Sequence, residues 1–147
     1  MEWAALVTWV VTALFGFTML SIYMSRGGPR QEQGIPARLL YGHFLLAAGG
    51  LVLWIVYLFT DSDALAWIAF VDLVVVAVGG WLMFGIWAKH RQRLAAGAHP
   101  GSGGVAAAGG GVPAEQAFPT WVIALHGLFA VATLLLVLLT ALGVGGS

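Results

Sequence analysis

Four apolar runs constrain what this chain can fold into more than any other feature of its sequence. They extend over roughly Trp3–Met24, Leu39–Thr60, Leu65–Ala88 and Thr120–Leu142. Each run is close to the length of about 20 residues that a helix needs to cross a hydrocarbon core. A lipid-embedded backbone must satisfy its own hydrogen bonds, and the runs do not alternate as barrel strands do, so we expect helices. The predicted fold is an all-α membrane protein, an up-down-up-down bundle of four transmembrane helices in one domain, 1–147.

Composition narrows the classes of function. Only 8% of the 147 residues are charged and 61% are hydrophobic, whereas soluble proteins contain about 25% charged residues. The absence of cysteine excludes disulfides, thiolate metal sites and iron–sulfur clusters. The formal net charge is zero, which gives no indication of nucleic-acid binding. The lipid bilayer is therefore the partner that composition predicts.

The basic residues predict how the helices are oriented. Loops one and three contain all of them: Arg26, Arg30, Arg38, Lys89, Arg91 and Arg93. The positive-inside rule therefore places these loops in the cytoplasm and both termini outside, in a multi-pass protein of the inner (plasma) membrane. The first run lacks a basic n-region and a clear cleavage site, so we expect a retained helix rather than a signal peptide.

The third loop contains a stretch rich in glycine and alanine, 95–117, with almost no charge. Such a composition cannot bury a core, and we interpret the stretch as a flexible linker. His90 and His99 lie in or beside this loop, and we expect both to be solvated.

The four runs are consistent with two copies of one helical hairpin, 1–62 and 63–147. Shifted by 64 positions, the first run matches the third at nine of 21 positions, including pairs of Trp, Gly and Met. Shifted by 83 positions, the second run matches the fourth, and His43 meets His126. The longer third loop accounts for the larger second offset. We therefore predict a tandem duplication whose halves are related by a pseudo-two-fold axis along the membrane normal.

His43 and His126 are the only histidines within the apolar runs. Ionisable side chains inside a membrane are costly and mark functional positions. Both lie a few residues inside their helices from the cytoplasmic end, so their depths agree within about one turn. The second and fourth helices of a bundle can share a diagonal, across which the imidazoles would face each other. The pair therefore predicts a metal or haem site in the cytoplasmic leaflet, with these two histidines as the metal ligands.

The other diagonal would bring glycine and methionine to the same level. Gly16 and Met19 on the first helix are three residues apart and share a face, as do Gly80 and Met83 on the third. The glycines would leave room for the edges of a planar macrocycle, so that the iron of one haem b takes an imidazole from each side. Bis-imidazole ligation leaves no open position and suits single-electron transfer. Arg38 is a predicted partner of a haem propionate.

With these residues the chain resembles the haem-binding four-helix bundle of membrane b-type cytochromes. In that family, histidines on the second and fourth helices ligate haem, and glycines on the first and third make room for it. The resemblance implies that His43 and His126 are axial ligands and that Gly16 and Gly80 face the haem. Members with two haems carry two histidines on each ligand helix, whereas this chain has one. The implied function is single-electron transfer through one haem, as a subunit or anchor for a redox partner.

Other functions stay open at this point. The two histidines and two methionines could bind copper(I), although methionine is more often core packing. The chain could be a cofactor-free accessory or assembly subunit of a larger membrane complex, and it could form a homodimer. It could also be a small metal- or proton-handling transporter. Because no catalytic triad, phosphate loop or zinc signature is present, an electron-transfer protein is favoured over a stand-alone enzyme.

Asp72 is the other ionisable residue within the apolar runs. It lies in the outer half of the third run, several turns from the predicted histidine level. We expect it to be hydrated or to bond a hydroxyl such as that of Thr8, its counterpart in the repeat. A transporter would use it as a proton site.

Overall fold

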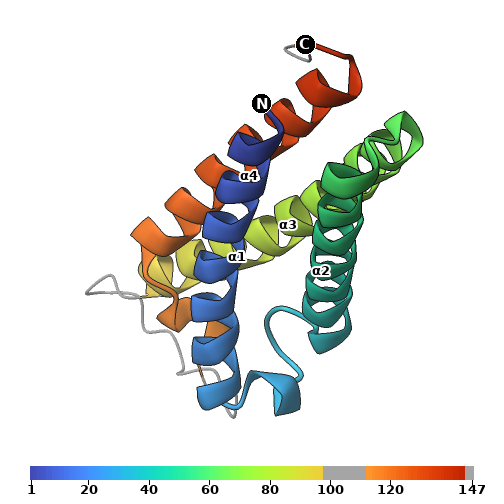
Figure 1. The fold of residues 1–147 in the computed structure, drawn as a ribbon. Helices are drawn as coiled ribbons and strands as arrows, with labels where there is room; N and C mark the ends of the chain where they lie inside the picture. Colours follow the sequence, from blue (N-terminus) through green and yellow to red (C-terminus); the bar gives the residue numbers. More distant parts are fainter. Residues whose placement is uncertain (98–111, 145–147) are drawn as a thin grey trace.

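The structure is a bundle of four long helices. The computed structural model describes residues 1–97 and 112–144, and no strand occurs within these two ranges. The long helices are α1 (Glu2–Ser25), α2 (Ala37–Thr60), α3 (Asp63–Gly97) and α4 (Thr120–Ala141), and the short 3-10 helices are η1 (Gly28–Arg30) and η2 (Ala114–Ala117) (Figure 1). The predicted all-α class is confirmed for the described part of the chain.

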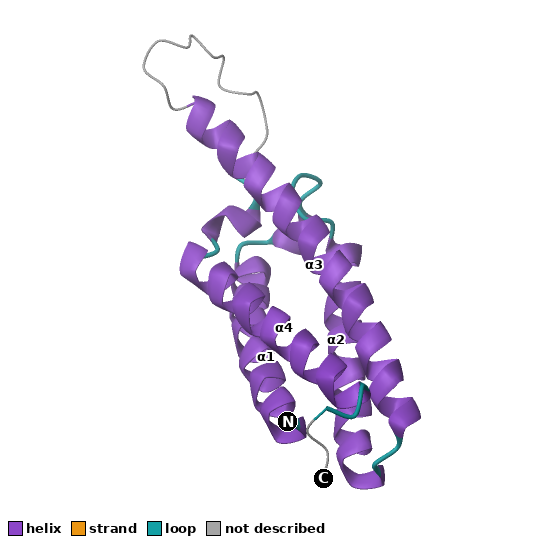
Figure 2. Ribbon diagram, turned by 90° about the horizontal axis from the view of Figure 1, so that it is seen from above, coloured by secondary structure: helices purple, strands orange, loops and turns teal. Residues whose placement is uncertain are grey.

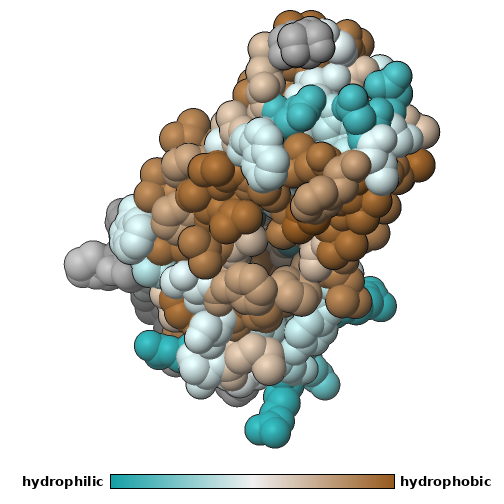
Figure 3. Space-filling model, viewed as in Figure 1, coloured by the Kyte–Doolittle hydropathy of each residue, from teal (hydrophilic) through white to brown (hydrophobic). Residues whose placement is uncertain are grey.

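The outer surface of the bundle is apolar. All four long helices are long and apolar enough to cross a membrane. Large apolar side chains lie on the outside, where the exposed fraction of Phe59 is 81% and that of Trp81 is 70%. Figure 3 shows apolar residues around the middle of the visible face and hydrophilic residues toward its two ends. Such a surface is stable against lipid rather than water, which supports the predicted multi-pass membrane protein.

The helices pack as two pairs. α1 packs mainly against α4 and α2 against α3, α3 also packs against α4, and of the neighbouring pairs α1 and α2 are in least contact. Figures 1 and 2 show α1 beside α4 and α2 beside α3. α2 and α4 therefore occupy one diagonal of the four-helix bundle, and α1 and α3 occupy the other.

Two helices start at a proline that stands at a fixed distance from a histidine. Pro36 is the N-cap of α2, and Pro119 is the N-cap of α4. The proline ring fixes φ and lacks an N–H, which suits the start of a helix and not its interior. Each proline lies seven residues before a histidine, His43 or His126. Both histidines therefore stand about 9 Å along their helices from the first helical residue.

The two ends of the bundle are built differently. At one end, Asp61 in the left-handed conformation (φ 50°) closes a short turn between α2 and α3. The start of α1 and the end of α4 lie around the same hollow, and we call this end the turn end. At the opposite end, the cap end, the loop 26–36 and η2 pack against the helices. The Tyr23 hydroxyl donates there to the Ile35 carbonyl oxygen at 3.0 Å.

The predicted linker 95–117 is structured at both of its described ends. Its first three residues belong to α3, because the segment KHRQRLAA, 89–96, is rich in strong helix formers and continues the helix. At its other end, Ala114 of η2 is buried, and its N–H donates to Gln31 Oε1 at 2.8 Å. The intervening residues 98–111, which include His99, lie outside the described residues.

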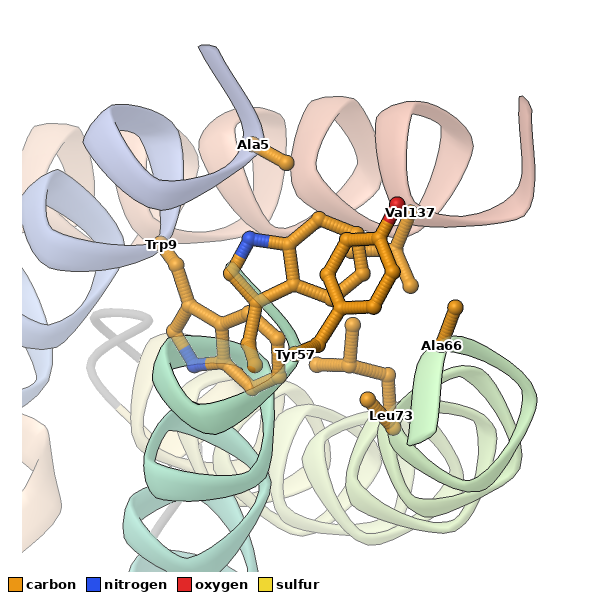
Figure 4. Close-up of a cluster of buried hydrophobic side chains, with 8 residues drawn as sticks. Ala5, Trp9, Tyr57, Ala66, Leu73 and Val137 are labelled. Atoms are coloured by element: carbon orange, nitrogen blue, oxygen red, sulfur yellow. The ribbon is translucent and has the colours of Figure 1, made fainter. Parts of the chain in front are cut away.

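An apolar cluster near the turn end holds the helices together. Trp54 is fully buried, and its ring centroid lies 4.7 Å from that of Tyr57 and 6.5 Å from that of Trp9. The Trp54 indole N–H donates to the Glu2 carbonyl oxygen at 3.3 Å, and the Tyr57 hydroxyl donates to Glu2 Oε1 at 3.1 Å. Figure 4 shows Trp9 and Tyr57 among side chains that come from all four long helices. The cluster therefore joins the two helix pairs.

Replacing Trp54 with alanine should lower the free energy of unfolding by about 3–5 kcal/mol, as expected for deletion of a buried Trp side chain. Denaturation in mixed micelles, followed by the loss of helical circular dichroism, measures this change. Trp81→Ala removes the same group from the lipid-facing surface and should change stability by about 0.5 kcal/mol or less. Equal losses in the two variants would show that the cluster does not hold the helices together.

Candidate functional site

The structure brings His43 of α2 and His126 of α4 together inside the bundle. Their ring centroids are 6.4 Å apart, and the ring planes are inclined by 54°. Both side chains are half-buried. Because α2 and α4 lie on a diagonal, the two imidazoles meet across the interior of the bundle, at a level set by the two prolines that start these helices.

Each imidazole is held by a carbonyl of a neighbouring helix. His43 Nδ1 lies 3.0 Å from the Val76 carbonyl oxygen of α3, and His126 Nδ1 lies 2.9 Å from the Thr12 carbonyl oxygen of α1. A carbonyl oxygen only accepts hydrogen bonds, so we assign the proton to Nδ1 in both rings, and Nδ1–H donates. The Nε2 atoms then keep their lone pairs, which is the form of histidine that binds a metal.

Gly16 makes the Thr12 carbonyl accessible to His126. In a helix this carbonyl already accepts the N–H of the residue four positions further on, which is Gly16. A Cβ atom at Gly16 would stand 3.3 Å from His126 Cε1, which is tighter than ordinary packing. Glycine therefore lets the imidazole lie against the helix backbone and use the second lone pair of the carbonyl oxygen.

The same arrangement recurs on α3. Val76 stands four residues before Gly80, and a Cβ atom at Gly80 would lie 3.5 Å from His43 Cε1, an ordinary contact. A Cβ atom at Gly79 would lie 3.5 Å from Nδ1 of the same ring. The glycines expected to face a macrocycle thus lie against the imidazoles themselves. Sequence reasoning missed Thr12 and Val76, because a residue of any type can supply a carbonyl.

Three other predicted site residues lie toward the cap end. Met19 and Met83 are partly buried and pack against the apolar cluster around Tyr23. Arg38 is exposed, and it precedes His43 by five residues, about 7.5 Å along α2. The two thioethers thus take part in apolar packing, the commonest use of methionine.

A buried carboxylate at the cap end escaped the sequence analysis. Glu115 of η2 is fully buried, and its Oε1 lies 3.2 Å from His90 Nδ1 of α3. The backbone at Gly34 (φ 99°) passes so close to this carboxylate that a Cβ atom there would collide with it. His90 was expected to be solvated and instead pairs with Glu115. The sequence contained one indication of this contact. Glu115 lies within the segment PAEQAF, at the C-terminal end of the stretch that composition alone predicts to be a linker.

Asp72 lies about two helical turns from His43 along the bundle, because its side chain packs against Gly50, seven residues after His43. On α3 it is one turn, about 6 Å, from the carbonyl that binds His43. Its Oδ2 atom is buried without a hydrogen-bond partner and packs against Gly50 of α2. The expected hydroxyl partner, Thr8, is instead bonded by the Thr133 hydroxyl, which donates to Thr8 Oγ1 at 3.0 Å.

Two imidazole nitrogens are too few to complete the coordination sphere of a bare metal ion. Within the described residues, no group of three or more His, Cys, Asp or Glu side chains could hold a metal. Metal–imidazole bonds are about 2.0 Å long, so rings on opposite sides of one metal stand about 6 to 7 Å apart between centres. The separation of His43 and His126 falls in this range. The pair therefore fits a metal that brings its own equatorial ligands.

No protein-family model, curated protein sequence or solved structure matches this chain. Its function is therefore inferred from the geometry of the histidine pair and the residues around it.

The carbonyl contacts predict the tautomer of both membrane histidines. In 15N-labelled protein without added metal, NMR spectra should show a protonated Nδ1 and an unprotonated Nε2 for His43 and His126. Gly16→Ala should shift the His126 signals, because that ring must move by a few tenths of an ångström. Gly80→Ala is the matched control and should leave the His43 signals nearly unchanged. Protons on Nε2 in the unaltered protein, or equal shifts in both variants, would contradict the assignment.

Proposed function

We propose that the chain is a membrane-embedded b-type cytochrome that binds one haem b between His43 and His126 and transfers single electrons. The observation that carries the proposal is the pair of imidazoles 6.4 Å apart, each held through Nδ1 so that Nε2 is left to bind a metal. Haem supplies the four equatorial nitrogens that the chain lacks and exchanges one electron at its iron without an open coordination position.

Residues of the chain would orient and tune such a site. The Thr12 and Val76 carbonyls fix the rotation of the two rings and raise the basicity of Nε2, as the outer partners of metal-binding histidines do. The bundle is least closed between α1 and α2. Figure 3 shows a recess in this face, where the edge of a planar cofactor would have room.

The contacts of the site support the proposal of a duplicated hairpin with alternating helix directions. Thr12 and Val76, whose carbonyls bind the histidines, are 64 positions apart, as are Gly16 and Gly80. The prolines that start α2 and α4 are 83 positions apart, as are the two histidines. These are the offsets of the sequence match. A pseudo-two-fold axis along the membrane normal would relate the two hairpins in this way, so that equivalent residues form equivalent contacts.

The charges support an orientation with the cap end in the cytoplasm and both termini outside. All six Lys and Arg residues lie in the two loops of this end or beside them. Arg38 is exposed and about 7.5 Å along α2 from His43, which supports a role as propionate partner. The haem would then lie near the cytoplasmic side of the inner membrane, within reach of a redox partner or of a larger complex that the chain anchors.

Copper(I) is the less favoured occupant of the same histidines. It would need thioether ligands to complete its coordination. Met19 and Met83 pack against the apolar cluster of the cap end instead.

The visible spectrum of detergent-purified protein tests the proposal. With haem supplied during expression, the oxidised and dithionite-reduced protein should show the Soret and sharp α bands of a six-coordinate haem. His43→Ala and His126→Ala should each abolish these bands or convert them to those of a five-coordinate haem, because each removes one axial ligand.

His90→Ala is the matched control, because it removes an imidazole from the cap end and should leave the spectrum unchanged. Met19→Leu should also leave the haem spectrum unchanged. If the histidines instead bound copper(I) together with Met19, the same variant would lose the copper. A colourless protein would overturn the cytochrome and favour a cofactor-free subunit of a larger complex.

A further inference from the structure

Asp72 is a carboxyl group inside the bundle that the proposed electron-transfer site does not use. It stands nine residues after Asp63, the first residue of α3, which places it about 13 Å into the helix from the turn end. Its Oδ2 atom is buried and has no hydrogen-bond partner. A polar atom left unpaired in an apolar interior costs several kcal/mol by transfer estimates, so such groups are retained at functional positions.

Within the described residues, no neighbour donates a hydrogen bond to Asp72 Oδ2. Its Oδ2 atom packs directly against the backbone of Gly50, where a Cβ atom would collide with it. The Trp9 ring closes the same space, with its Cζ2 atom 3.0 Å from where that Cβ would stand. An indole carbon and a glycine methylene offer no strong hydrogen bond. The Oδ2 atom is therefore enclosed by apolar atoms, whereas the Asp72 side chain as a whole is half-buried.

The other helix pair has a satisfied polar contact at the corresponding place. Thr8 is 64 positions before Asp72, and Thr133 is 83 positions after Gly50, the same offsets that relate the histidine contacts. The Thr133 hydroxyl donates to Thr8 Oγ1 at 3.0 Å, and the Thr8 hydroxyl donates in turn to the Ala5 carbonyl oxygen of its own helix at 3.0 Å. At this level the α1–α4 pair thus contains two hydrogen-bonded hydroxyls, whereas the α2–α3 pair contains a carboxyl oxygen without a partner among the described residues.

Few other titratable groups lie near this depth. On α2 they are His43 and Tyr57, each seven residues from Gly50, and α4 carries His126 alone. On α1 the nearest is Glu2, seven residues from Trp9, where it accepts the Tyr57 hydroxyl. On α3 itself the next acid is Asp63, and the fully buried Glu115 of η2 lies at the opposite, cap end. Seven residues correspond to about 10 Å of helix, so Asp72 has no charged neighbour within about two turns.

We propose that Asp72 is the proton-binding residue that compensates the charge of the electron held between His43 and His126. When haem is bound, its iron would take up one electron from a one-electron donor, and the Asp72 carboxylate would take up one proton from water to become the carboxylic acid. Loss of the electron releases the proton. An added charge is costly at low dielectric, and a proton one helical turn from the carbonyl that orients His43 offsets it. The imidazoles cannot take this proton, because Nδ1–H is donated and Nε2 binds the metal.

This inference rests on the proposed cytochrome, and its test is a redox titration of the haem-loaded protein in detergent at a series of pH values. The midpoint potential should fall as pH rises, with a limiting slope of one proton per electron, and the reduced-minus-oxidised infrared spectrum should contain a carboxylic-acid band. Asp72→Asn should remove both the slope and the band while keeping the visible spectrum. Asp63→Asn makes the same change at the exposed start of α3 and should alter neither.

A potential independent of pH in the unaltered protein overturns the inference, whether or not the Asn variant folds. A slope that persists in Asp72→Asn overturns it as well. If the chain binds no haem, the proposed cytochrome function is overturned. Infrared titration of the colourless protein then tests whether Asp72 binds a proton. A carboxyl band that titrates and is lost in Asp72→Asn then supports the proton site, and its absence overturns it.

Discussion

The hydrogen bond from each membrane histidine to a helix carbonyl is the contact on which the arrangement of this protein depends. It joins α2 to α3 through His43 and Val76, and α4 to α1 through His126 and Thr12. An unpaired imidazole N–H inside an apolar bundle would cost about 1–3 kcal/mol. In both cases the acceptor is a backbone oxygen, which becomes reachable where the residue four positions on lacks a side chain. The bond therefore sets the rotation and register of each helix pair and leaves both Nε2 atoms available.

The two ends of the bundle are closed by different balances of apolar packing and polar contacts. Trp54 and its aromatic neighbours join all four helices near the turn end. At the cap end, loop 26–36 and η2 are held by hydrogen bonds and by the contact between Glu115 and His90. Between these closures lie the histidines and the glycines, where side chains are small and α1 and α2 approach each other least. The proposed cofactor would bind in this part of the bundle, between the two closures.

The residues of the candidate site could be predicted from the sequence where their type and their depth in the helices were sufficient to identify them. Two histidines at one level on the second and fourth helices, with glycines at that level on the other two, could be read from spacing, and the structure places them together. Spacing did not reveal that the glycines lie against the imidazoles or that carbonyls hold them. It also did not identify Gly50 as the neighbour of Asp72, and it assigned the segment around Glu115 to a linker. Each of these depends on contacts between segments far apart in the chain.

The sequence by itself determined that this chain forms four apolar helices and how deep each polar residue lies within them. Length and hydropathy decide both, because a lipid-embedded segment must pair its backbone internally and every residue adds a fixed rise. Only the tertiary structure decided which face of each helix points inward. The helices are apolar on nearly all sides, so no amphipathic stripe marks the buried face. That choice was made by packing between helices, which left Asp72 Oδ2 unpaired against Gly50 within the described residues and brought the two imidazole centroids to 6.4 Å from each other.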